Sequence, residues 1–149
     1  VVEHFAGTYC GVEGNAPALA KMRQAFADIG AEWVVIDGAA KVLYHAAAVM
    51  ASNYLVTLLD VAQQAYVKAG VADDVALKLM APLVRETLEN VLRIGPGKAL
   101  TGPVARGDLK TVELQSKAVH AWDARDGAMY DLMADLTASL AARSRPKVS

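Results

Sequence analysis

The pattern of apolar and polar positions changes sharply near residue 38. Before it, residues 5–14 mix aromatic, β-branched and glycine residues as a short strand and its turn do, and residues 33–36 form a fully apolar strand. Between them, apolar residues recur at helical spacing over residues 19–29. After residue 38 the pattern predicts four or more helices and no further convincing strand. The sequence therefore predicts a mainly α fold preceded by a short β-α-β segment.

Local signals mark the ends of the first helix. Asn15 can cap its N-terminus, Pro17 lies in its first turn, and Gly30 ends it. Two strands and one helix cannot bury a sheet by themselves. We therefore expect this segment to extend another sheet or to lie against the helices that follow.

The stretch 41–70 is the one around which the rest is expected to be organised. Residues 42–59 carry no formal charge, yet Tyr44, His45, Ser52, Asn53, Tyr54 and Thr57 lie among them. At about 100° per residue, His45 and Ser52 fall within about 20° of each other, with Asn53 close by. A helix that is apolar nearly all round is typically buried and central, so its polar stripe should face a polar helix, water or a ligand. These polar insertions argue against a membrane-spanning segment.

The remaining helices follow from caps and breaks. A helix opens at residues 73–74, and Pro82 is expected to kink or end it before an amphipathic segment to residue 93. Residues 94–107 hold four glycines and two prolines and are expected to be irregular. Asp108 should cap a helix to about residue 120, and a last helix is expected over roughly residues 124–142. The basic residues 143–149 are expected to be a disordered tail.

Composition narrows the class of protein. The chain is 54% apolar and 21% charged, which is more apolar surface than a monomer of this size easily hides, so we expect a homo-oligomeric interface. The net charge of −1 gives no electrostatic reason to expect nucleic acid or an anionic membrane as a partner. Cys10 alone excludes an internal disulfide and fits a buried thiol in a reducing, cytoplasmic compartment. No signal peptide is visible, and a chain that starts at Val1 suggests a fragment or a processed product.

Several kinds of chemistry are excluded by missing motifs. The three histidines have no metal-ligand spacing, so no metal site is expected. The sequence contains no GxGxxG, GxxxxGK[ST] or GxSxG pattern. It therefore carries no nucleotide loop and no hydrolase nucleophile elbow of its own.

Two polar groups on helices are candidates for a site. His45 with Ser52 and Asn53 could protonate and orient a carbonyl oxygen, or could form a satisfied buried network that holds helices in register. Thr87 and Asn90, three residues apart, form a second polar patch that could bind substrate or could match the first group structurally.

The segment 101–108 is the best candidate loop. Arg106 could bind a carboxylate with two parallel hydrogen bonds, and Thr101 could add a hydroxyl. The alternative is structural: Arg106 would only pair with Asp108, and Asp108 would only cap a helix.

Four sequence motifs together resemble a known bacterial family. These are GTYCGVEGN (7–15), YHAAAVMASNYL (44–55), TLEN (87–90) and LTGPVARGD (100–108). They resemble the C-terminal part of two-domain proteins in which a Rossmann-like NADP-binding domain precedes a helical domain of uncharacterised function. The resemblance implies that residues 1–38 are the tail or junction of the Rossmann-like domain. Residues 39–142 would be a helical domain of the 6-phosphogluconate dehydrogenase C-terminal type, related to ketopantoate and pyrroline-5-carboxylate reductases.

The resemblance also implies a function for the parent protein. It would be an NADP-dependent reductase of a small 2-keto acid such as ketopantoate, with NADP bound mainly by the missing N-terminal domain. Asn53 fits an asparagine of the wider group, but Val49 stands where that group has a lysine, so His45 is the nearest replacement as acid. The expected substrate-binding residues are Ser52, Thr87, Asn90, Thr101, Gly102, Pro103 and Arg106. The alternative is a non-catalytic module for dimerisation or ligand sensing.

Overall fold

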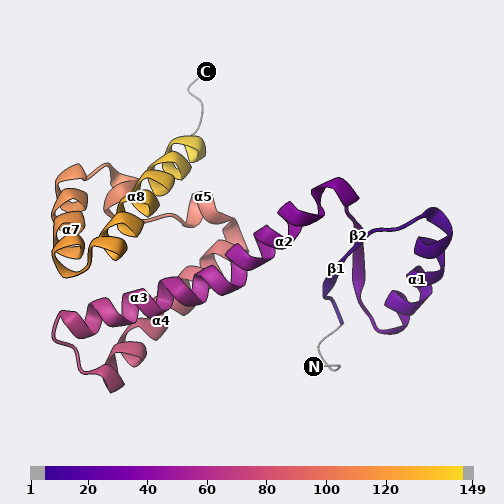
Figure 1. The fold of residues 1–149 in the computed structure, drawn as a ribbon, viewed down its shortest axis with the longest axis horizontal. Helices are drawn as coiled ribbons and strands as arrows, with labels where there is room; N and C mark the ends of the chain where they lie inside the picture. The colour runs from indigo at the N-terminus through magenta and orange to yellow at the C-terminus, as the bar shows by residue number, and fades with distance from the viewer. Residues whose placement is uncertain (1–5, 146–149) are drawn as a thin grey trace. The chain divides into compact units, whose positions relative to one another are not determined.

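The computed structural model describes residues 6–145 and divides into two compact units (Figure 1). Val1–Val56 make up the first unit and Thr57–Ser149 the second. Each unit is described by itself. The domain boundary that composition places after residue 38 stays a prediction.

The first unit begins with the expected β-α-β segment. Strands β1 (Tyr9–Val12) and β2 (Glu32–Val35) pair in parallel, with Tyr9 opposite Glu32 and Val12 opposite Val35. Parallel neighbours need a crossover connection, and α1 (Ala16–Asp28) provides it. The Asn15 side chain caps α1 by accepting a hydrogen bond from the Ala18 N–H at 3.0 Å. The mainly α fold with this short β-α-β lead-in is therefore confirmed.

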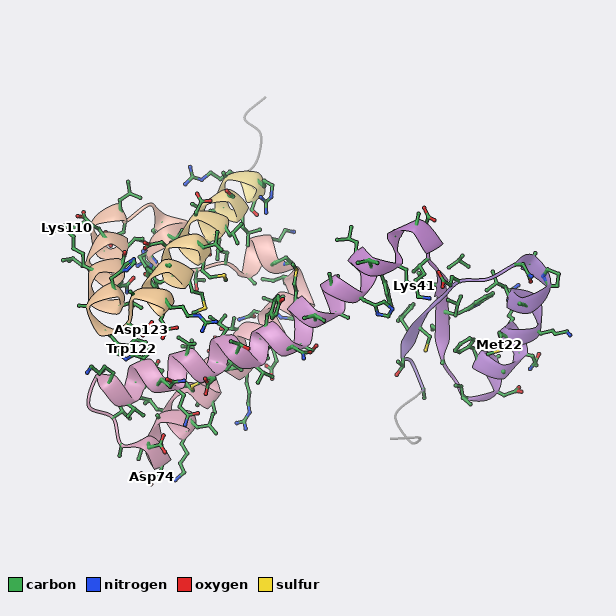
Figure 2. The ribbon with its side chains drawn as sticks, viewed as in Figure 1. Met22, Lys41, Asp74, Lys110, Trp122 and Asp123 are labelled. Atoms are coloured by element: carbon green, nitrogen blue, oxygen red, sulfur yellow. The ribbon has the colours of Figure 1, made fainter. Side chains whose placement is uncertain are left out.

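The first unit continues into the long helical stretch. A 3₁₀ turn, η2 (Gly38–Ala40), leads into α2 (Lys41–Val49), then a π-helical turn, η3 (Met50–Tyr54), and then the start of α3 (Leu55–Lys68). Two side chains of α2 tie it to the first strand. Lys41, labelled in Figure 2, forms an ion pair with Glu13, the residue that follows β1. The Tyr44 ring lies over Gly11, where a Cβ atom would stand 2.6 Å from the ring's Cζ and hydroxyl oxygen.

The second unit contains the rest of α3 and five further helices. They are α4 (Asp73–Ile94), α5 (Pro96–Ala99), α6 (Gly102–Arg106), α7 (Leu109–Trp122) and α8 (Ala124–Ser144). Helix α4 runs through Pro82, so the expectation that a new helix starts there was wrong, while a kink at Pro82 stays a prediction. The expectation of an irregular stretch over 94–107 was also wrong, because it contains two short helices. Of the expected tail, residues 143–144 belong to α8, and residues 146–149 lie outside the described residues.

Helices α7 and α8 form a hairpin whose caps follow from aspartates. Asp108 accepts from the Thr111 N–H at 3.1 Å, and Asp123 accepts from the Asp126 N–H at 3.0 Å. Asp123 and Trp122 lie at the turn between the two helices (Figure 2). The hairpin is close because Gly127 is buried against His120, where a Cβ atom would stand 2.4 Å from the imidazole ring.

The described residues bury little of their apolar surface. Their buried hydrophobic side chains are Ala31, Ala76 and Met80. The long helix, expected to be buried and central, has no buried residue over 41–68, and Val42 is 83% exposed. Cys10, expected to be buried, is half-buried. Hydrophobic periodicity indicates that a face avoids water, but it does not indicate whether the same chain covers that face.

The long helix also meets a simple criterion for membrane spans. By length and composition, the segment Gly38–Lys68 could cross a membrane, with a mean hydropathy of 1.5 and no burial within the described chain. The core helix of a protein that is covered by a partner passes the same test. The polar side chains of the segment remain the argument against a span.

Candidate functional site

The first group of predicted residues lies on the long helix of the first unit. His45 belongs to α2, and Ser52 and Asn53 belong to η3. The Ser52 hydroxyl lies 2.7 Å from the Ala48 carbonyl oxygen and 2.8 Å from Asn53 Oδ1, and its single hydrogen serves one acceptor at a time. The His45 ring meets the Tyr44 ring edge to face, with 5.6 Å between their centroids.

The π-helical turn changes the geometry of this group. A π turn holds more residues than an α turn, so the 100° spacing that aligned His45 with Ser52 does not apply across residues 50–54. Single π turns occur frequently at functional sites. All three residues are exposed in the described chain, so they do not form a network buried within it.

The second group of predicted residues comes together in a pocket of the second unit. Thr87 and Asn90 of α4 line it, and so does Thr101, which precedes α6. Its volume is about 370 Å³, within the range of small-molecule sites. The other residues that line it are Leu83, Glu86, Val91, Pro96, Ala99, Leu100 and Leu140. Two polar patches that are separate in the sequence thus meet around one hollow with largely apolar walls.

Two charged residues at this pocket were not predicted. Glu86 lines it directly, and Arg93 donates from Nη2 to Asn90 Oδ1 at 2.6 Å. Both residues lie on α4, on the face that carries Asn90, since offsets of four and seven residues return to one side of a helix. This helical spacing is the sequence signal that could have identified Glu86 and Arg93, whereas the prediction named only Thr87 and Asn90.

The remaining predicted residues lie on α6. Gly102 and Pro103 open this helix and are half-buried, whereas Arg106 ends it and is exposed. Arg106 is not among the residues that line the pocket, and its role in binding a carboxylate stays a prediction. Asp108 accepts hydrogen bonds from the Thr111 hydroxyl and N–H, and these, with the nearby Arg106 charge, lower the pKa of the Asp108 carboxyl. The reading of Asp108 as a helix cap is confirmed.

A larger hollow of about 530 Å³ lies elsewhere on the second unit. It is lined by Asp60, Gln63, Gln64, Val67, Lys68, Asp73 and Trp122. Amide groups already engage its carboxylates: Gln64 donates to Asp60 at 2.7 Å and Gln63 to Asp73 at 3.3 Å. None of the residues singled out by the sequence lines it. The smaller pocket is therefore the better candidate site.

A serine, a histidine and an aspartate also meet between α7 and α8. The Ser116 hydroxyl donates to Asp131 at 2.6 Å, and His120 Nε2 lies 2.8 Å from the other oxygen of the same carboxylate. A nucleophilic serine needs the histidine as its base, whereas here both bond to the aspartate. This cluster joins two helices and does not form a catalytic triad. Among the described residues, no group of three potential ligands could hold a metal ion.

Comparisons with known proteins place this geometry in context. A family model described as a domain of unknown function (DUF2520) matches residues 8–137. The crystal structure of protein TM1727 from Thermotoga maritima is similar, with a TM-score of 0.83, 28% identity and 93% of this chain covered. The structure of BF3122 from Bacteroides fragilis, named as a proposed NADP oxidoreductase, has a TM-score of 0.71, 23% identity and 87% of this chain covered.

These structures are longer than the chain. The chain spans 55% of the Thermotoga protein and 49% of the Bacteroides protein. A search of curated proteins found no match.

Proposed function

Since the chain belongs to the family of the domain of unknown function DUF2520, we propose that it is the helical, substrate-binding portion of an NADP-dependent oxidoreductase. One observation carries the proposal. Thr87, Asn90 and Thr101, chosen from the sequence as substrate-binding residues, line one pocket of small-molecule size. Polar groups converging in an apolar hollow are the usual form of such a site.

A likeness of fold supports the proposal of NADP as the cofactor. The similar structure from Bacteroides fragilis is named as a proposed NADP oxidoreductase, and at 23% identity this likeness concerns the fold. The sequence contains no GxGxxG pattern, so NADP would be bound mainly by a Rossmann-like domain that precedes this chain in the parent protein. The 149 residues alone should therefore catalyse no nicotinamide-dependent turnover. We place the parent protein in the bacterial cytoplasm, a compartment that keeps Cys10 reduced.

The proposed substrate is a small 2-keto acid, as in ketopantoate reductase. NADPH would supply a hydride to the keto carbon, and a proton on the keto oxygen completes the hydroxyl group. In this chain, His45 would donate that proton and Asn53 would orient the oxygen, with the Ser52 hydroxyl beside Asn53 Oδ1. In the second unit, Thr87, Asn90 and Thr101 would bind substrate in their own pocket, with Gly102 and Pro103 shaping the turn that carries Thr101.

The protein is proposed to act as a homodimer. Large apolar side chains of the described chain remain exposed, including Leu43 at 72% and Leu92 at 87%. A surface of this kind normally meets another protein surface. A second copy and a small substrate are the partners that composition and charge favour.

The test is turnover by the full-length parent protein. NADPH consumption would be measured with a panel of small 2-keto acids, for the wild type and for Asn90→Ala. We expect Asn90→Ala to raise KM by about tenfold, the effect of losing one or two substrate hydrogen bonds. Glu89→Ala, on the same helix but outside the pocket, is the matched control and should leave KM unchanged.

The outcome also separates the two functions under consideration. No turnover with any 2-keto acid, together with retained binding of the acids, would favour the non-catalytic ligand-sensing module. Val49, at the place of the wider group's lysine, is the residue that keeps this second function open.

A further inference from the structure

Glu86 sets the charge of the pocket between α4, α5 and α8. Among the residues that line this pocket, Glu86 is the one with an ionisable side chain, and the other polar ones are Thr87, Asn90 and Thr101. A ligand carboxylate placed beside Glu86 would be repelled. The carboxylate of Glu86 accepts hydrogen bonds, so the ligand group that faces Glu86 must be a hydrogen-bond donor. The donor is either a hydroxyl group or a primary ammonium group.

Arg93 places a positive charge next to Asn90, a residue of the same pocket. Its Nη2 donates to Asn90 Oδ1 at 2.6 Å, and Asn90 lines the pocket. A guanidinium has five N–H donors, and this bond uses one of them, so others can bind an anion. The bond to the Asn90 carbonyl oxygen also leaves the NH₂ group of that amide to donate to a ligand. Neither Arg93 nor Arg106 lines the pocket itself, but Arg93 is hydrogen-bonded to a residue that does.

The two charges are spaced along one helix. Glu86 and Arg93 are seven residues apart on α4, which places their Cα atoms about 10 Å apart along the axis. The Arg93 side chain extends toward Asn90, which lies between Arg93 and Glu86 on the helix. The distance that a ligand must span between the two charged groups is therefore shorter than the distance between the Cα atoms. Leu83, Val91 and Leu140 are among the aliphatic residues that line the pocket.

We propose that this pocket binds a small aliphatic acid that carries a hydroxyl or primary ammonium group at its other end, with the carboxylate at Arg93 and the donor group at Glu86. The inference rests on the proposed function, because it names the substrate class of the same site. It assigns the carboxylate to Arg93, and Arg106 is the competing assignment. A hollow of about 370 Å³ lies at the lower end of the range of small-molecule sites and has room for a small acid of this kind.

The experiment titrates the chain with four matched probes and follows amide shifts by NMR. Hydroxypivalate carries a hydroxyl group and a carboxylate on a branched carbon frame, and aminopivalate carries an ammonium group in place of the hydroxyl. Pivalate lacks the donor group, and neopentyl alcohol lacks the carboxylate. We expect one of the first two probes to bind at least about tenfold more tightly than either of the last two, the effect of one charge-assisted hydrogen bond.

Variants then assign each end of the ligand. Arg93→Gln should weaken the acid probes by about tenfold and leave neopentyl alcohol unaffected, since only the anion loses its partner. Arg93→Lys should restore part of the affinity, and Arg85→Gln, on the same helix outside the pocket, should change nothing. Glu86→Gln should weaken aminopivalate strongly and hydroxypivalate less, because only the ammonium group depends on the negative charge. The amide spectrum of each variant reports whether it is folded.

Three results would overturn the inference. Pivalate could bind as tightly as both donor-bearing acids, or Arg106→Gln could weaken the acids while Arg93→Gln does not, or no probe could shift the pocket residues. None of these binding measurements uses a nicotinamide cofactor. A failure of turnover in the parent protein therefore leaves the binding result intact, and a failure of binding leaves the turnover test to stand by itself.

Discussion

At the scale of single residues, Gly11 shows most directly how one side chain limits another. The Tyr44 ring occupies the space where a Cβ atom of residue 11 would lie, at 2.6 Å from the ring. Gly11→Ala should therefore lower the free energy of unfolding by about 1–3 kcal/mol, the usual cost of overpacking. Chemical denaturation measures this change. In a Tyr44→Leu background the same substitution should cost much less, and equal costs in both backgrounds would show that the ring is not the cause.

The residues of the candidate site were only partly predictable. Thr87 and Asn90 could be chosen from the sequence as a polar patch on a helix, and Thr101 as a hydroxyl in a stretch rich in glycine and proline. Glu86 and Arg93 looked like ordinary charged surface residues, and their place at the pocket depends on how α5 and α8 lie beside α4. Arg106 was chosen for its chemistry in a loop, and that chemistry does not indicate which hollow it faces.

At the scale of elements, the contact between α7 and α8 should depend on pH. Asp131 accepts hydrogen bonds from Ser116 and His120, which lower the pKa of its carboxyl below the usual value of 3.8. A folded-state pKa below the unfolded one adds stability that is fully present above about pH 5 and is lost as pH falls below 3.8 through the lowered value. Asp131→Asn should remove this dependence. Thermal unfolding of both proteins between pH 6 and about pH 3 measures it.

The matched control for Asp131 lies on the same helix. Asp135 is exposed, and the variant Asp135→Asn should keep the wild-type slope of unfolding temperature against pH. Parallel slopes for wild type and Asp131→Asn would contradict the proposed coupling.

Local sequence signals predicted most elements and missed those that depend on longer-range geometry. The caps Asn15 and Asp108 fixed helix starts correctly, since a side chain that accepts from the first turn acts locally. Pro82 did not end α4: the residues on both sides of it are helical, although a proline removes one backbone hydrogen bond. The π turn at residues 50–54 left no local signal beyond the pair Ser52-Asn53 within an apolar run.

At the scale of the whole molecule, many large apolar side chains of the described residues are exposed. The long helix of residues 41–68 and helix α4 both contribute, with Val42 at 83% and Leu92 at 87% exposed. A stable interface buries about 800 Å² on each partner. Exposed apolar side chains on either helix can contribute to such an area, so the expected cover is a second copy of the chain.

Sedimentation equilibrium tests this expectation on the full chain. We expect a dimer at micromolar concentration, and we expect Leu92→Glu to raise its dissociation constant by at least about tenfold, because a charge would be buried at the interface. Lys98→Glu, a charged and exposed residue, is the control and should have little effect. A chain that is monomeric in buffer, and that floats with lipid vesicles when these are added, would instead show that a membrane covers the helix Gly38–Lys68. A dimer that stays with the buffer would agree with the polar side chains His45, Ser52 and Asn53, which are costly in a hydrocarbon layer but tolerable beside a protein cleft.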